Sequence, residues 1–131
     1  TSPRRQLVDP TSPGYFHCVT RCVRRAFLCG FDAETGDSFE HRKQWVEERI
    51  LELGSILAVG VYAYAVMSNH VHVVVYVDPD AAARWSDEEV GVRWARLFPV
   101  RLPDGSVDAL ATRNRVEATA GNPERVSTCR A

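Results

Sequence analysis

Three segments of the chain have the residue pattern of β-strands: 15–23 (YFHCVTRCV), 61–67 (VYAYAVM) and 70–77 (HVHVVVYV). All three are rich in β-branched and aromatic residues, and the first and third alternate so that every second side chain shares a face. Only Ser68 and Asn69 separate the second segment from the third, which predicts a tight hairpin turn.

Two segments have the three- and four-residue spacing of amphipathic helices. The first runs from about 38 to 58, and the second covers 85–98, where Ser86 and Glu89 form a capping-box pattern. Beyond residue 98, breaks at Gly, Pro and Asn predict an irregular tail at 99–131. The order β, α, β, β, α predicts an α+β fold at 15–98, in which an antiparallel sheet has helices on one face. Residues 1–14 contain prolines and a glycine among polar residues, which predicts an extended lead-in.

Composition allows one ordinary globular domain, because the chain has 131 residues and 45% hydrophobic side chains. The formal net charge is only -1, so the whole chain has no strong field for a polyanion, although arginines gather near its beginning. No stretch approaches the roughly 18–20 apolar residues of a membrane span, and no apolar signal-peptide core is seen. We therefore expect a cytoplasmic protein without a membrane partner.

Four cysteines occur, and without a signal for an oxidising compartment reduced thiols are expected. His17, Cys18, Cys22 and Cys29 form a possible zinc ligand set, but the spacing differs from the usual C-x-x-C pair. The competing interpretation is that the cysteines are small apolar side chains in the core.

The clearest chemical feature is the pair His70 and His72 on the third predicted strand. Residues two apart on a strand project from one face about 6.5–7 Å apart, which suits binding of one divalent ion by two imidazoles. Such an ion can act as a Lewis acid on a phosphate oxygen. Two alternating histidines on a half-exposed strand also arise by chance, so the triplet alone does not decide between a metal site and ordinary surface.

The longer context of the triplet resembles a known family. The stretches YFHCVTRCVRRAFLCG, SFEHRKQWVEERI and AYAVMSNHVHVVV, continued by WSDEEV and RWARLFPV, resemble the REP-associated tyrosine transposases of the HUH single-tyrosine transposase group. The resemblance covers roughly residues 4–100. It implies a ferredoxin-like sheet in which His70 and His72 hold Mg²⁺ or Mn²⁺ beside a phosphate of single-stranded or hairpin DNA.

In that family a tyrosine on a later helix attacks the phosphate and forms a 5′-phosphotyrosine link during strand transfer. Here the tyrosines are Tyr15, Tyr62, Tyr64 and Tyr76, and none follows the second predicted helix. The resemblance therefore implies a partial domain that lacks its nucleophile, so we expect the chain as given to catalyse no strand transfer. Truncation, gene decay or a fragmentary record would each explain the missing tyrosine. Tyr76 shares the histidine face, but it lies at the far end of a rigid strand and is a poor substitute.

Further DNA contacts are expected near the first strand, at His17, Arg21, Arg24 and Arg25. Two competing functions stay open. One is a metal-independent nucleic-acid-binding module whose sheet presents Tyr15, His17 and Arg21 to unpaired bases. The other is a structural remnant without activity. The sequence leaves open whether the chain is a monomer or a dimer.

Overall fold

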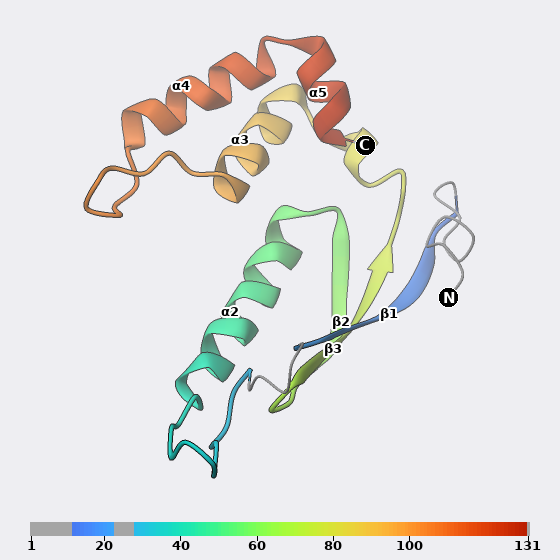
Figure 1. Ribbon diagram of the computed structural model, residues 1–131. Coiled ribbons are helices and arrows are strands. Elements are labelled where there is room, and N and C mark those ends of the chain that lie inside the picture. Colours follow the sequence, from blue (N-terminus) through green and yellow to red (C-terminus); the bar gives the residue numbers. More distant parts are fainter. Residues whose placement is uncertain (1–11, 23–27, 131) are drawn as a thin grey trace. The chain divides into compact units, whose positions relative to one another are not determined.

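The computed structural model describes residues 12–22 and 28–130 (Figure 1). By internal contacts the chain divides into two compact units, the first made of residues 1–55 and 59–78 and the second of 56–58 and 79–131. Most of the predicted lead-in at 1–14 lies outside the described residues.

The first unit contains a three-stranded antiparallel sheet with the order β1-β3-β2. Its strands are β1 (Gly14–Arg21), β2 (Val59–Val66) and β3 (His70–Val77). All three predicted strands are confirmed, with ends that shift by up to two residues. The hairpin is also confirmed, because the Met67 N–H donates to the His70 carbonyl at 2.9 Å across Ser68 and Asn69.

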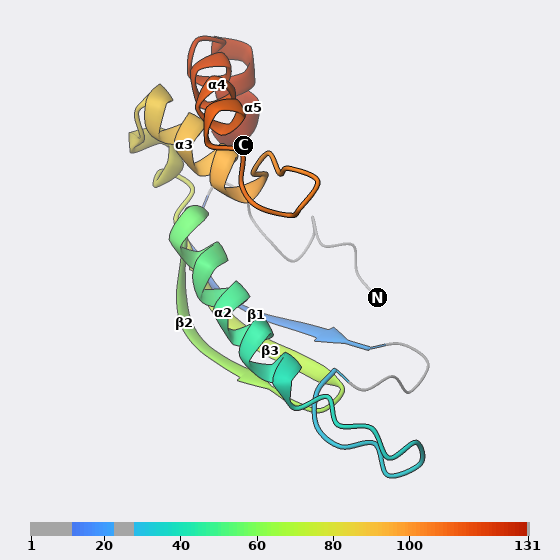
Figure 2. The same cartoon turned by 90° about the vertical axis from the view of Figure 1, so that its left-hand side faces the viewer.

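One face of this sheet is covered by helix α2 (His41–Ile56), which lies along it (Figures 1 and 2). The alternation of β3 turns Val71 to this side, where it is 6% exposed. The chain approaches the helix closely at Gly54, where an added Cβ would lie 2.7 Å from the Val61 Cγ2. Apolar side chains of β2 and β3 therefore meet the helix.

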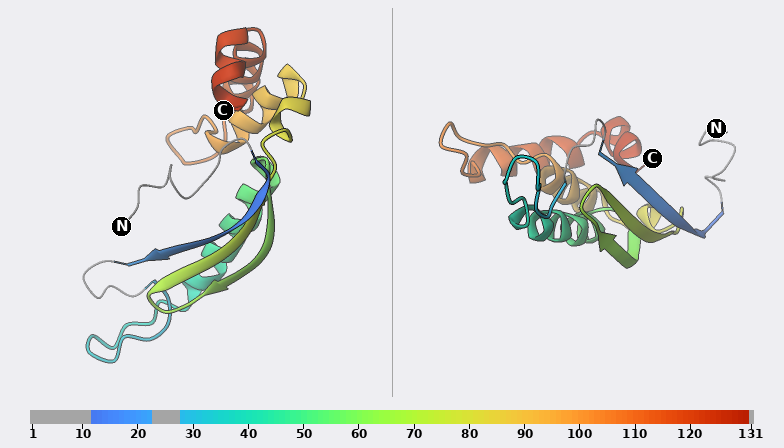
Figure 3. Two further views of the ribbon diagram at one scale, coloured as in Figure 1. Left: turned by 90° about the vertical axis from the view of Figure 1, so that its right-hand side faces the viewer. Right: turned by 60° about the horizontal axis from the view of Figure 1, so that its bottom comes forward.

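The opposite face of the sheet carries no helix of this unit within its described residues (Figure 3). The strand register brings Tyr15 opposite Tyr76, His17 opposite Val74 and Arg21 opposite His70. We call this surface the open face. It carries the histidines and arginine that the sequence singled out, because alternation sends them away from α2.

Helix α2 begins three residues later than predicted. The segment before it forms a small loop closed by a bridge between Phe31 and Ser38, and the Phe39 N–H donates to the Gly30 carbonyl at 2.7 Å. These contacts hold residues 38 and 39 in the loop, so the helix starts at His41.

The second unit is helical. It contains a short 3₁₀ helix (Ala82–Arg84) followed by α3 (Asp87–Leu97), α4 (Ala109–Ala120) and α5 (Pro123–Arg130). The predicted cap of α3 is confirmed, because the Glu89 N–H donates to the Ser86 Oγ at 3.1 Å. The other half of the capping box differs, since the Glu89 carboxylate accepts from Arg93 at 2.8 Å.

The prediction of an irregular tail at 99–131 is wrong, because α4 and α5 occupy most of it. Two residues interpreted as breaks, Asn122 and Pro123, lie at the start of a helix instead. Asp108 caps α4 by accepting the Ala111 N–H at 2.9 Å, and the Asn122 side chain accepts the Arg125 N–H at 3.1 Å before α5. Pro123 occupies the first position of α5, where its missing N–H costs nothing.

Helix periodicity was not visible in the tail because few apolar side chains are buried there. The buried residue of α4 is Thr119, which is 1% exposed, and that of α5 is Val126, which is 2% exposed. On the other side of the contact, Gly91 and Ala95 of α3 are buried. Short side chains let α3 and α4 approach closely, but they produce almost no apolar stripe in the sequence. The α+β class and the antiparallel sheet are confirmed and are consistent with a ferredoxin-like arrangement. Within the described residues, no helix is both long and apolar enough to cross a membrane.

Candidate functional site

Three histidine rings gather on the open face, from β1 and β3. The rings of His70 and His72 have centroids 4.9 Å apart, and those of His17 and His72 stack with centroids 5.0 Å apart. His70 and His72 share the face because one residue separates them on β3, and His17 joins them because β1 pairs with β3. The sequence predicted the first pair, but only strand pairing shows that His17 reaches it.

Each histidine of the predicted metal pair has its Nδ1 atom engaged by a neighbour. The Asn69 Oδ1 lies 2.5 Å from the His70 Nδ1, and the His17 Nε2 lies 2.8 Å from the His72 Nδ1. An amide oxygen can only accept, so the His70 Nδ1 carries a proton, and in the neutral ring the Nε2 then has a free lone pair. If His72 likewise donates from Nδ1 to His17, its Nε2 is also free to bind a cation.

The spacing of the two rings is compatible with a shared divalent cation. Metal–imidazole bonds of about 2.1 Å bring two ring centroids to about 5 Å when both rings bind one ion, and the observed separation is 4.9 Å. A partner on the second ring nitrogen is the usual way in which proteins fix a histidine ligand. Mg²⁺ binds almost entirely to oxygen, so of the two expected ions Mn²⁺ suits an imidazole pair better.

The candidate site consists of two imidazoles. Among residues 12–22 and 28–130, no group of three His, Cys, Asp or Glu side chains is placed to bind one metal ion together. The suggested zinc ligands are not brought together, because Cys18 and His17 are consecutive on β1 and point to opposite faces of the sheet. Cys29 is buried instead, and its Sγ lies 3.3 Å from the Met67 carbonyl oxygen.

The other predicted DNA-contacting residues are partly described. Arg21 is exposed at the end of β1 and lies opposite His70 in the strand register, so its chain position borders the histidines. Arg24 and Arg25 lie outside the described residues. Tyr76 shares the open face with the histidines, four and six residues further along β3, which agrees with its predicted position at the far end of the strand.

A group of tyrosines on the open face was only partly foreseen. Tyr15, Tyr62 and Tyr76 have neighbouring rings, although strict alternation along β2 would have placed Tyr62 with Tyr64. A register shift between Val61 and Ala63 breaks that alternation and turns Tyr62 to the open face. Gly60 in β2 is a residue type that often accompanies a bulge, but it does not show which neighbour is bulged.

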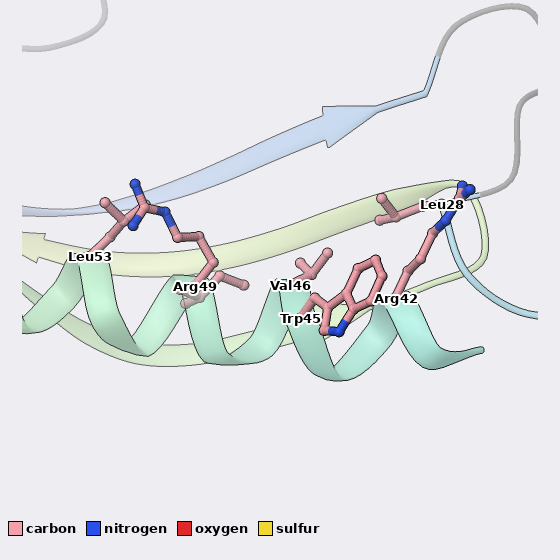
Figure 4. Close-up of a pocket in the computed structure, with 7 residues that line it drawn as sticks. Leu28, Arg42, Trp45, Val46, Arg49 and Leu53 are labelled. Carbon is pink, nitrogen blue, oxygen red and sulfur yellow. The ribbon is translucent and has the colours of Figure 1, made fainter. Parts of the chain in front are cut away.

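A separate pocket of about 400 Å³ lies on α2, lined by the apolar side chains of Trp45, Val46, Ile50, Leu53 and Leu28 (Figure 4). Two arginines, Arg42 and Arg49, complete its lining. The pocket contains no histidine or carboxylate and belongs to the helix side of the sheet, so it offers nothing to the chemistry of the histidine pair.

Comparisons of this chain with protein-family models, with curated proteins and with solved structures find no match. The residues of the open face and the sequence resemblance are therefore the basis for a function.

Proposed function

We propose that this chain is an HUH-type DNA strand-transfer domain that binds single-stranded or hairpin DNA through a divalent cation held by His70 and His72. The observation that carries the proposal is the imidazole pair itself, with ring centroids 4.9 Å apart and each Nδ1 atom engaged by Asn69 or His17. When bound, the ion supplies positive charge and Lewis acidity to a phosphate oxygen.

The surrounding residues support an anionic ligand. Arg21 at the end of β1 is exposed near the histidines and offers a charge-assisted hydrogen bond to phosphate. The resemblance of the MSNHVHVVV segment to the REP-associated tyrosine transposases points to the same ligand. The sequence contains no tyrosine after Tyr76, so no residue matches the family's nucleophile and we expect DNA binding without cleavage.

Calorimetric titration of the full chain with Mn²⁺ tests the metal site directly. We expect one bound ion, and loss of that binding in His70→Ala and His72→Ala. His41→Ala is the matched control, because His41 is an exposed histidine on α2 whose ring contacts Trp45. Equal Mn²⁺ affinity in all four proteins would remove the basis of the proposal.

A second experiment separates this function from a metal-independent binding module, which the exposed tyrosines of the open face favour. Fluorescence anisotropy with a labelled DNA hairpin, with Mn²⁺ or with EDTA, gives opposite expectations for the two. Metal-assisted binding weakens in EDTA and in His72→Ala, whereas the module would bind equally in every case. Incubation with hairpin DNA and Mn²⁺ should yield no covalent adduct, and a phosphotyrosine product would refute the assignment of this chain as non-cleaving.

A further inference from the structure

Three tyrosines from three different strands form one aromatic cluster on the open face. The ring of Tyr15 lies 5.0 Å from that of Tyr62 and 4.9 Å from that of Tyr76, and the Tyr62 and Tyr76 rings are 6.3 Å apart. Aromatic rings at these separations stabilise one another, so the three side chains form a single preorganised surface. We call Tyr15, Tyr62 and Tyr76 the tyrosine platform.

The strand geometry holds this platform in place. A bulge turns Tyr62 to the open face, and its ring lies over Gly60, where an added Cβ would be 3.2 Å from the Tyr62 Cε2. Tyrosine side chains are ordinarily uncharged at neutral pH. A side-chain hydrogen bond with Tyr62 raises the pKa of Tyr15 further above its usual value. An uncharged surface does not repel a phosphate backbone.

Much of the platform is left exposed to solvent. Tyr15 is 62% exposed and Tyr62 is 63% exposed, although large aromatic side chains generally bury most of their surface. Adjacent exposed apolar groups of this size mark interaction surfaces more often than single exposed residues do. The rings are held together but not covered, so they can accept a flat partner without first rearranging.

The position of the platform identifies the partner. Tyr76 lies four residues from His72 on the same face of β3, which corresponds to about 13 Å along the strand. His17 lies two residues from Tyr15 on β1, so polar and aromatic groups are continuous along the open face. A nucleic-acid strand with a phosphate at the histidine pair would bring bases over the tyrosines within a few nucleotides. Aromatic rings stack with any unpaired base, because every base has a π-face.

We propose that Tyr15, Tyr62 and Tyr76 form a stacking site for unpaired bases of single-stranded DNA. The site extends the proposed function by naming where bases bind, and it depends on that function only for the choice of DNA as ligand. Stacking needs no metal ion, so the platform can be tested separately from the histidines.

The test uses the full chain, a fluorescein-labelled oligothymidine and an abasic oligonucleotide of the same length, all in EDTA. We expect Tyr62→Leu and Tyr15→Leu each to weaken oligothymidine binding by about tenfold, the usual scale for one stacked base. Tyr62→Phe keeps the ring and should bind nearly as well as the unchanged protein. The abasic strand should bind the unchanged protein and the leucine variants equally weakly.

Tyr64→Leu is the matched control, because Tyr64 lies opposite Val73 and so faces the helix side of β2. Circular dichroism confirms that each variant is folded, and the conservative Phe variant keeps the test decisive if a Leu variant unfolds. The proposal fails if the unchanged protein does not prefer the oligothymidine over the abasic strand, or if Phe weakens binding as much as Leu. It also fails if sedimentation shows a dimer that Tyr62→Leu dissociates, since the platform would then join two copies of the chain.

The failure of this proposal can be told apart from failure of the metal site. Mn²⁺ affinity should be unchanged in Tyr62→Leu, while His70→Ala should lose Mn²⁺ affinity and keep its preference for the oligothymidine in EDTA. A chain that binds no Mn²⁺ but retains the tyrosine-dependent preference would refute the metal site and leave the stacking site supported.

Discussion

Replacement of Gly91 by alanine tests the packing of the second unit, because the expected sign depends on whether α3 and α4 are in contact. A Cβ added at Gly91 would lie 2.8 Å from the Val116 carbonyl oxygen and 3.3 Å from the Val116 Cγ1. The oxygen belongs to the backbone of α4 and cannot rotate away, so the two helices would have to separate.

The two effects of this substitution oppose each other. Alanine is better than glycine inside a helix by about 1 kcal/mol, which would stabilise an α3 that made no contact with α4. Forcing an extra carbon into a packed interface costs about 1–3 kcal/mol. We therefore expect Gly91→Ala to lower the free energy of unfolding of the second unit by about 1 kcal/mol.

Urea unfolding followed by tryptophan fluorescence measures this change in a Trp45→Phe background. That background leaves Trp85 and Trp94, which both belong to the second unit. The unfolding midpoint should fall by about 0.5 M. Val92→Ala is the control, because Val92 is 42% exposed on the same helix and should change stability by less than about 0.5 kcal/mol. A higher midpoint for Gly91→Ala would show that α3 and α4 do not pack as described.

Three further predictions follow from contacts in the two units. Asn69→Ala removes the acceptor that fixes the His70 tautomer, so Mn²⁺ affinity measured by calorimetry should fall about tenfold or more, and unchanged affinity would contradict the tautomer argument. Ser86→Ala removes the oxygen that accepts the Glu89 N–H, and the second unit should lose about 1 kcal/mol in urea unfolding, whereas an unchanged midpoint would mean that the cap is unimportant. Burial raises the pKa of the Cys29 thiol, so its thiolate forms only at higher pH. A thiol reagent at pH 8 should therefore modify the exposed Cys18 before Cys29, and mass spectrometry that showed the reverse order would contradict the burial of Cys29.

The histidine site shows which contacts the alternation of neighbouring residues can predict and which it cannot. The alternation of residues 70–77 predicted that His70 and His72 share a face, and the structure agrees. The contact between His17 and His72 joins residues 55 positions apart, so no local window contains it. Likewise, the bulge that turns Tyr62 towards Tyr15 depends on the pairing of β2 with β3.

The last third of the chain shows a different limit of sequence reasoning. Asn122 and Pro123 can end a helix or begin one, and the choice depends on what the following residues pack against. Helix α4 has no strong apolar stripe, since its contact with α3 uses small residues and backbone around Gly91. In this part of the chain the helices are stabilised by tertiary packing, and the spacing of apolar residues gives no sign of them.

The sequence by itself determined the strands, the hairpin, helices α2 and α3 and the shared face of His70 and His72, because each follows from the period of residues close along the chain. Only the tertiary structure decided that His17 engages the His72 Nδ1, which tyrosines form the platform and that 109–120 and 123–130 are helices. Those features depend on contacts between distant segments, whose partners are chosen by packing and hydrogen bonding across strands and helices rather than by local preference.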